Sequence, residues 1–172
     1  MRWLVTVLLV SALTACAAAP NDPYPMPSGS PTMWQNNPAR LGEAVRGVML
    51  YITPRAGDRI ELLSAEPVGE THGAHVEFWL SRPVPQTDGS LVIGEDLEPL
   101  PGAVIQNDSD ASGPEHTVGI VAEIEPIEPG HHQLTGVRLR YRLNGGDELV
   151  GEGTDVIFTV CGADPAPQSC ED

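Results

Sequence analysis

The segment QLTGVRLRYRL at residues 133–143 decides the fold of this 172-residue chain. Its apolar side chains Val137, Leu139, Tyr141 and Leu143 alternate with three arginines. A period of two places the apolar side chains on one face of a β-strand and the arginines on the other. The segment therefore predicts an antiparallel strand that is buried on one face only.

A turn signal follows this strand directly. Asn144-Gly145-Gly146-Asp147 predicts a tight hairpin turn, because asparagine and glycine accept positive φ. Other short apolar runs, separated by Gly, Pro, Asp and Asn, predict strands at residues 45–53, 59–65, 74–81, 91–93, 117–125 and 155–160. Residues 82–90 and 94–116 are rich in Pro, Gly and Asp and predict long loops.

About seven strands, each with one apolar face, predict an all-β fold. We expect an antiparallel β-sandwich with an immunoglobulin-like layout, and a small β-barrel is the alternative.

Two interpretations are open for Arg138, Arg140 and Arg142. If strands 117–125 and 133–143 pair through the turn at Pro126–His132, the arginines face Glu123 and Glu125 across the ladder. Alternatively, the arginines form a strip that binds an anionic ligand such as a carboxylate or a phosphate.

Near the N-terminus, an apolar run, Trp3–Leu13, follows Arg2. The motif Leu13-Thr14-Ala15-Cys16 stands at the end of this run. The run is too short to span a bilayer, which needs about 20 residues. The segment resembles a bacterial lipoprotein signal peptide with its lipobox, in which the chain is cut before the cysteine and the thiol carries a diacylglycerol. The resemblance implies lipidation of Cys16 and attachment to the cell membrane on its extracytoplasmic side. An ordinary cleavable signal and an uncleaved anchor are the alternatives.

We therefore expect a signal peptide at residues 1–15, a lipidated cysteine and Pro-rich tether at 16–40, and a β-sandwich at 41–172. Six prolines within residues 17–40 remove backbone donors and oppose regular structure. Tyr24, Met26, Met33 and Trp34 are the larger side chains of this tether. Docking on the domain or plain disorder is the favoured interpretation, and a strip that binds a partner is the alternative.

The chain is strongly acidic, with 24 Asp and Glu against nine basic residues, all of them arginine. Without residues 1–15, whose only charged residue is Arg2, the formal charge becomes 8 − 24 = −16. This balance excludes nucleic acid as a partner, because such binding needs a basic footprint. It also opposes electrostatic attachment to anionic lipid.

The chain has three cysteines. If Cys16 carries lipid, Cys161 and Cys170 remain, and outside the cytoplasm such a pair persists as a disulfide. We expect this bridge to fix the C-terminus to the last strand.

Five histidines are candidate metal ligands: His72, His75, His116, His131 and His132. On an extended strand, the spacing of His72 and His75, and of His131 and His132, sends the two members of each pair to opposite faces. Surface or loop positions are therefore the better prediction, and Met26 and Met33 lie in the tether. Asn107-Asp108-Ser109-Asp110, with Glu115, offers oxygens for calcium but lacks the other positions of an EF-hand loop.

No hydrolase or nucleotide-binding motif is present, so we predict neither catalytic residues nor a cofactor. The sequence favours a lipid-anchored, non-enzymatic accessory or interaction module with a protein partner at the cell envelope. A lipoprotein that binds a metal or an anionic ligand is the alternative.

Overall fold

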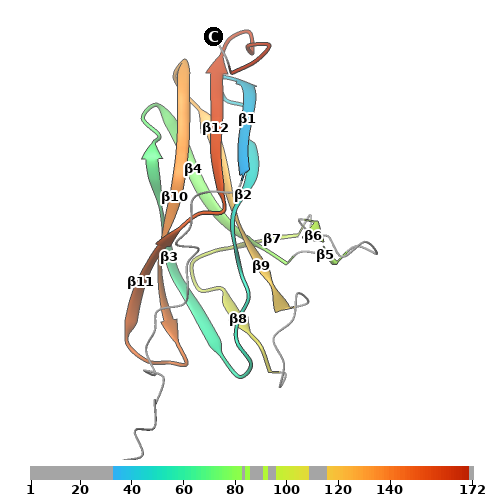
Figure 1. Ribbon diagram of the computed structural model, residues 1–172. Helices are drawn as coiled ribbons and strands as arrows, with labels where there is room; N and C mark the ends of the chain where they lie inside the picture. The colour runs from blue at the N-terminus through green and yellow to red at the C-terminus, as the bar shows by residue number, and fades with distance from the viewer. Residues whose placement is uncertain (1–32, 83, 86–90, 93–95, 109–115, 171–172) are drawn as a thin grey trace, which may run out of the picture.

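The computed structural model describes residues 33–82, 84–85, 91–92, 96–108 and 116–170 (Figure 1). The expected signal peptide, Cys16 and residues 17–32 of the expected tether lie outside these residues. The described residues contain no helix that is long and apolar enough to cross a membrane. The strands in chain order are β1 (Met33–Arg40), β2 (Val45–Ile52), β3 (Arg59–Glu70), β4 (Ala74–Ser81), β5 (Val84–Pro85), β6 (Leu91–Val92), β7 (Leu97–Pro99), β8 (Val104–Gln106), β9 (Val118–Pro126), β10 (Gly130–Leu143), β11 (Glu148–Gly153) and β12 (Val156–Ala163).

The strands form the predicted β-sandwich. The first sheet has the order β1-β12-β10-β3-β8, with β11 added to β10, and the second has the order β2-β9-β4-β7. The triplets β2-β9-β4 and β3-β10-β12 correspond to strands B-E-D and C-F-G of the immunoglobulin layout. No strand pairing joins these two sheets among the described residues, as in a sandwich of two separate sheets. β5 and β6 pair only with each other.

The tether prediction is wrong for residues 33–40. These residues form β1, which pairs in parallel with β12 from Met33–Val156 to Arg40–Ala163. Pro38 is tolerated because β1 is an edge strand, where a missing N–H does not interrupt the sheet. The fold therefore includes β1, and Ala39 contributes to its core.

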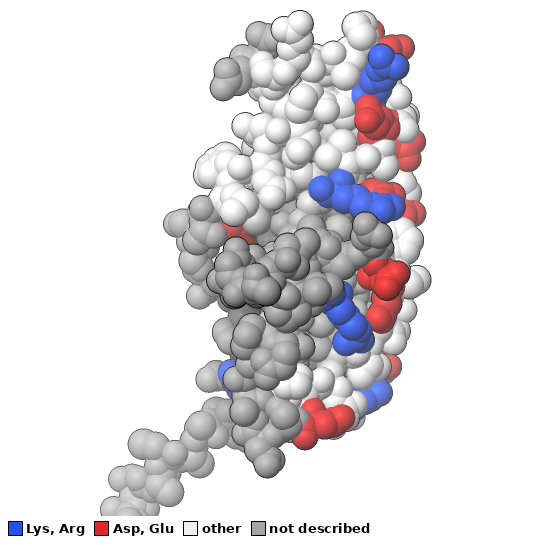
Figure 2. Space-filling view, turned by 90° about the vertical axis from the view of Figure 1, so that its right-hand side faces the viewer, with Lys and Arg blue, Asp and Glu red and all other residues white. Residues whose placement is uncertain are grey.

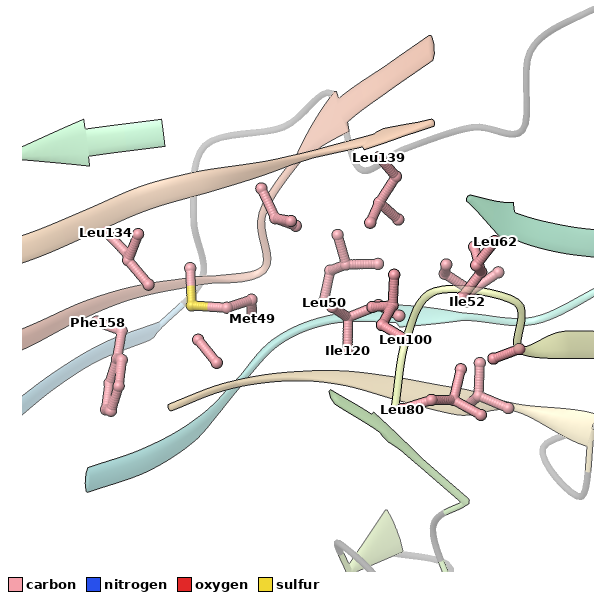
Figure 3. Close-up of a cluster of buried hydrophobic side chains, with 14 of the residues drawn as sticks. Met49, Leu50, Ile52, Leu62, Leu80, Leu100, Ile120, Leu134, Leu139 and Phe158 are labelled. Carbon is pink, nitrogen blue, oxygen red and sulfur yellow. The ribbon is translucent and has the colours of Figure 1, made fainter. Parts of the chain in front are cut away.

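Alternating apolar residues from both sheets fill the core (Figure 3). Met49, Leu134 and Phe158 lie at one end of the cluster, and Leu62 and Leu80 lie toward the other. All five side chains are fully buried. Burial of a side chain of this size contributes about 1.5–3 kcal/mol, so this cluster is a main source of stability.

The predicted hairpin turn is confirmed. Asn144 and Gly145 have φ of 53° and 72°, and the N–H of Gly146 donates to the carbonyl oxygen of Leu143 at 2.9 Å, which closes a tight turn. β10 pairs with β11 in the antiparallel direction up to Arg142 and Glu148. β11 itself was not among the predicted strands, and β5, β7 and β8 lie within the two predicted long loops.

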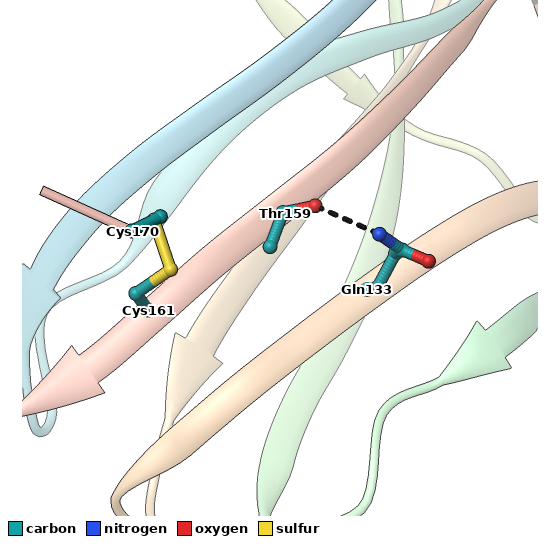
Figure 4. The surroundings of a disulfide bond; sticks show 4 residues. All are labelled: Gln133, Thr159, Cys161 and Cys170. Carbon is teal, nitrogen blue, oxygen red and sulfur yellow. Dashed lines mark hydrogen bonds between the residues drawn. A yellow bond between two sulfur atoms is a disulfide. The ribbon is translucent and has the colours of Figure 1, made fainter. Parts of the chain in front are cut away.

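The predicted disulfide between Cys161 and Cys170 is present (Figure 4). It returns the C-terminal residues to β12. Thr159 and Cys161 are buried on this strand, and Gln133 of β10 donates a hydrogen bond from Nε2 to Thr159 Oγ1 at 3.2 Å. The tail and the Gln133 side chain thus cover part of β12 that would otherwise face solvent.

Candidate functional site

The three arginines of β10 lie on the outer face of the first sheet, and each is paired with a glutamate. Arg138 donates from Nε and Nη2 to Glu152 at 3.1 and 2.8 Å, and its Nη1 lies 3.9 Å from Glu66. Arg140 donates to Glu148 from Nε at 2.6 Å. The pairing interpretation is therefore correct in kind, and the arginines do not form an unpaired strip.

The prediction that Glu123 and Glu125 are the partners of these arginines is wrong. β9 and β10 belong to different sheets, so the connection between them crosses the sandwich and does not form a hairpin. Glu61 of β3 lies 3.7 Å from Arg142 instead. Glu123 pairs with Arg46 of β2. Figure 2 shows arginine and acidic side chains interleaved along the right-hand side of the view.

The five histidines are distributed over several elements. His72 lies in the turn after β3, His75 on β4 and His116 before β9, while His131 and His132 begin β10. His131 is exposed and His132 is 2 % exposed, as opposite faces of a strand require. Among the described residues, no three His, Cys, Asp or Glu side chains form a group that could hold a metal ion.

His132 connects two turns at one end of the sandwich. Its Nδ1 lies 2.8 Å from the carbonyl oxygen of His72, and its Nε2 lies 3.0 Å from that of Glu128. The same turns are joined through Gly73, whose carbonyl accepts from the N–H groups of Ile127 and Glu128 at 2.7 and 2.9 Å. Carbonyl oxygens only accept, so a neutral ring makes one of the two His132 bonds and a doubly protonated ring makes both. The start of β4 is thereby fixed to the β9–β10 connection.

The candidate calcium loop is only partly described, since Ser109, Asp110 and Glu115 lie outside the described residues. Asn107 is fully buried, and its Nδ2 donates to the carbonyl oxygen of Pro54 at 3.2 Å. Asp108 accepts a hydrogen bond from Gln106. The Asn107 amide thus holds two neighbouring loops together.

Met33 and Trp34 do not dock on the domain through their side chains. They lie at the start of β1 and are 52 % and 65 % exposed. Their backbone pairs with Val156 and Ile157 of β12. Tyr24 and Met26 lie outside the described residues.

One side of the sandwich has free strand edges. β4 pairs with β9 along its whole length, but it pairs with β7 only from Trp79 to Ser81. β3 pairs with β8 only from Arg59 to Glu61. Within the described part of the chain, residues 74–78 of β4 therefore have no strand on their outer side.

An apolar hollow of about 290 Å³ lies beside this free edge. Its lining residues come from β3, from β4 and from the segment around the end of β7. They are Ala65, Val76, Glu77, Phe78, Trp79, Pro99, Leu100 and Pro101. Val76 and Phe78 are only partly buried, although they belong to the inward-facing row of β4. The free edge and the hollow together form the strongest candidate site on the described surface.

The sequence predicted the alternation of β4 but not its free edge. Pro99 and Pro101 are the available signal, because Pro99 stands at the end of β7 and neither proline has an N–H to extend the ladder along β4. No family model matches the chain, and no curated protein is significantly similar to it. Its function is therefore inferred from its own residues.

Proposed function

We propose that the protein is a lipid-anchored interaction module on the extracytoplasmic side of the cell membrane. Its partner is an extended segment of another protein, which binds along the free edge of β4. The anchor rests on the lipobox resemblance at Leu13-Thr14-Ala15-Cys16. The binding role rests on one observation, the unpaired half of β4 beside an apolar hollow.

An exposed sheet edge binds an extended peptide in a well-defined way. Backbone hydrogen bonds supply affinity, and pockets for every second side chain supply specificity. On β4 the backbone of residues 74–78 offers the bonds, and the hollow next to Val76 and Phe78 accepts alternate side chains. A strand added there continues the line of β7.

The edge of β4 is a better template than the edge of β3. β3 carries Pro67, which has no N–H. The carbonyl oxygen of Leu62 already accepts from the N–H of Gly102 at 2.8 Å, and the N–H of Leu62 donates to the carbonyl oxygen of Ala103 at 2.9 Å. β4 contains no proline between Ala74 and Ser81. The bonds around His132 also hold the start of β4 in place, which lowers the ordering cost of binding.

The alternative role, binding of a metal or an anionic ligand, has weaker support. Arg138, Arg140 and Arg142 already face glutamates, so an anion would have to displace these carboxylates. The described histidines do not converge on a common point.

The test uses the mature, lipidated chain in detergent and a short uncharged peptide that alternates valine and threonine. Calorimetric titration measures the affinity for the parent and for two variants with the same substitution. Ala65→Leu fills the hollow, and Ala56→Leu adds the same atoms at an exposed position in the turn between β2 and β3, outside the lining of the hollow. We expect Ala65→Leu to weaken binding and Ala56→Leu to leave it unchanged. If the parent does not bind, or if both variants bind equally well, the proposal is wrong.

A further inference from the structure

The outer face of the second sheet carries a row of charges that ends at the free edge. Register places Arg46 of β2 opposite Glu123 of β9, and Glu123 opposite Glu77 of β4. Arg46 and Glu123 form an ion pair, so the Arg46 charge is already used within the sheet. Like charges directly opposite one another destabilise a ladder, which makes the Glu123–Glu77 pair unfavourable.

Beyond Glu77, the row would continue on a strand that pairs with the outer edge of β4. The described residues supply no strand at this position. β7 reaches β4 only at Trp79, Leu80 and Ser81, so no side chain of β7 stands opposite Glu77. The partner within ion-pairing distance of Glu77 is His75, at 3.0 Å on the same strand. A cation placed opposite Glu77 would compensate the two adjacent carboxylates.

We infer that the β4 edge selects a basic strand, with arginine or lysine directly opposite Glu77 and an apolar residue on each side of it. This inference rests on the proposed strand-binding function. Successive side chains of a strand point to opposite faces, so the residues next to the cation point toward Val76, Phe78 and the hollow. The recognised pattern is therefore apolar–basic–apolar, read along an extended segment.

The charge of the whole chain favours the same partner. The formal charge of −15 on the chain attracts a cationic segment and opposes pairing between two copies of the protein.

A charge-swap cycle tests the inference. Two short peptides differ only at one central position, which is arginine in one and glutamate in the other, with valine on both sides. Each is titrated into the mature chain and into the Glu77→Arg variant at low ionic strength. The control is Asp147→Arg, which makes the same charge change in the β10–β11 turn, where the aspartate is exposed.

We expect the parent to bind the arginine peptide roughly three- to ten-fold more tightly than the glutamate peptide, from the usual strength of cross-strand charge pairs. Glu77→Arg should reverse this preference, and Asp147→Arg should keep it. Equal binding of both peptides overturns the basic preference but leaves strand binding intact. If neither peptide binds, both the basic preference and the strand-binding function are wrong. The same holds if the free protein forms a dimer through β4 that blocks the peptide. An equal effect of both variants overturns the role of Glu77, because it would show only the general field of an acidic protein.

Discussion

Replacement of His132 by phenylalanine should destabilise the protein more than the same replacement at its exposed neighbour His131. The variant keeps a ring of similar size but removes both nitrogens. The carbonyl oxygens of His72 and Glu128, now 2.8 and 3.0 Å from those nitrogens, lose their partner. The surroundings cannot easily supply water, because His132 is only 2 % exposed.

The magnitude follows from the number of groups left without a partner. A buried polar group that loses its hydrogen bond costs about 1–3 kcal/mol. The ring makes at least one of the two bonds, and both when it is doubly protonated, so we expect a loss of about 2–4 kcal/mol. This is a large fraction of the usual free energy of unfolding, which is about 5–15 kcal/mol.

Urea unfolding measures this loss as a shift of the midpoint at constant slope. The matched control is His131→Phe, the same substitution at the exposed neighbour on β10, where a change within about 0.5 kcal/mol is expected. An unchanged midpoint for His132→Phe, or equal shifts for both variants, would contradict the assigned role of His132 in joining the two turns.

Three further predictions concern the anchor, the disulfide and the β3–β10 ladder. Cys16→Ala should release the protein from washed membranes in cell fractionation, and retention without detergent would argue against lipid attachment. Replacing Cys161 and Cys170 by serine should lower the free energy of unfolding by roughly 2.5–3 kcal/mol, because the bridge closes a loop between two residues with a sequence separation of 9, and an unchanged urea midpoint would contradict this. Gly69→Ala should cost more than about 3 kcal/mol and reduce the yield of folded protein, because Gly69 has a φ of +132° and an added Cβ would lie 2.2 Å from the carbonyl oxygen of Gln133. If the Gly69→Ala variant folds and unfolds at the urea midpoint of the parent, the close approach of Gly69 to the Gln133 carbonyl is refuted.

Local pattern was sufficient for the strands that bury one face. The alternation around Leu139 and the Asn144–Gly145 turn predict β10 and its hairpin, because side-chain direction and positive φ are local properties. β1 could not be predicted in this way. Residues 33–40 lack alternation and include Pro38, and they become a strand because β12 offers a free edge for parallel pairing.

The site depends on relations that local sequence does not encode. The partners of Arg138 and Arg140 lie on β11, and that of Arg142 lies on β3, so the pairing requires the register of three strands. The connection after Pro126 can form a hairpin or cross between sheets, and its sequence is compatible with both. The free edge of β4 follows from where β7 ends, which is a property of a neighbouring strand and not of β4.

Amide hydrogen exchange along β4 tests the central claim most directly, because one strand contains both the free and the covered edge. In the free protein, the outward amides within residues 74–78 should exchange faster than those at Trp79–Ser81, which β7 covers. Addition of the peptide with arginine between valines should slow the former group and leave the latter unchanged. Uniformly slow exchange before addition, or no slowing at 74–78 at saturating peptide, would contradict a strand-binding edge on β4.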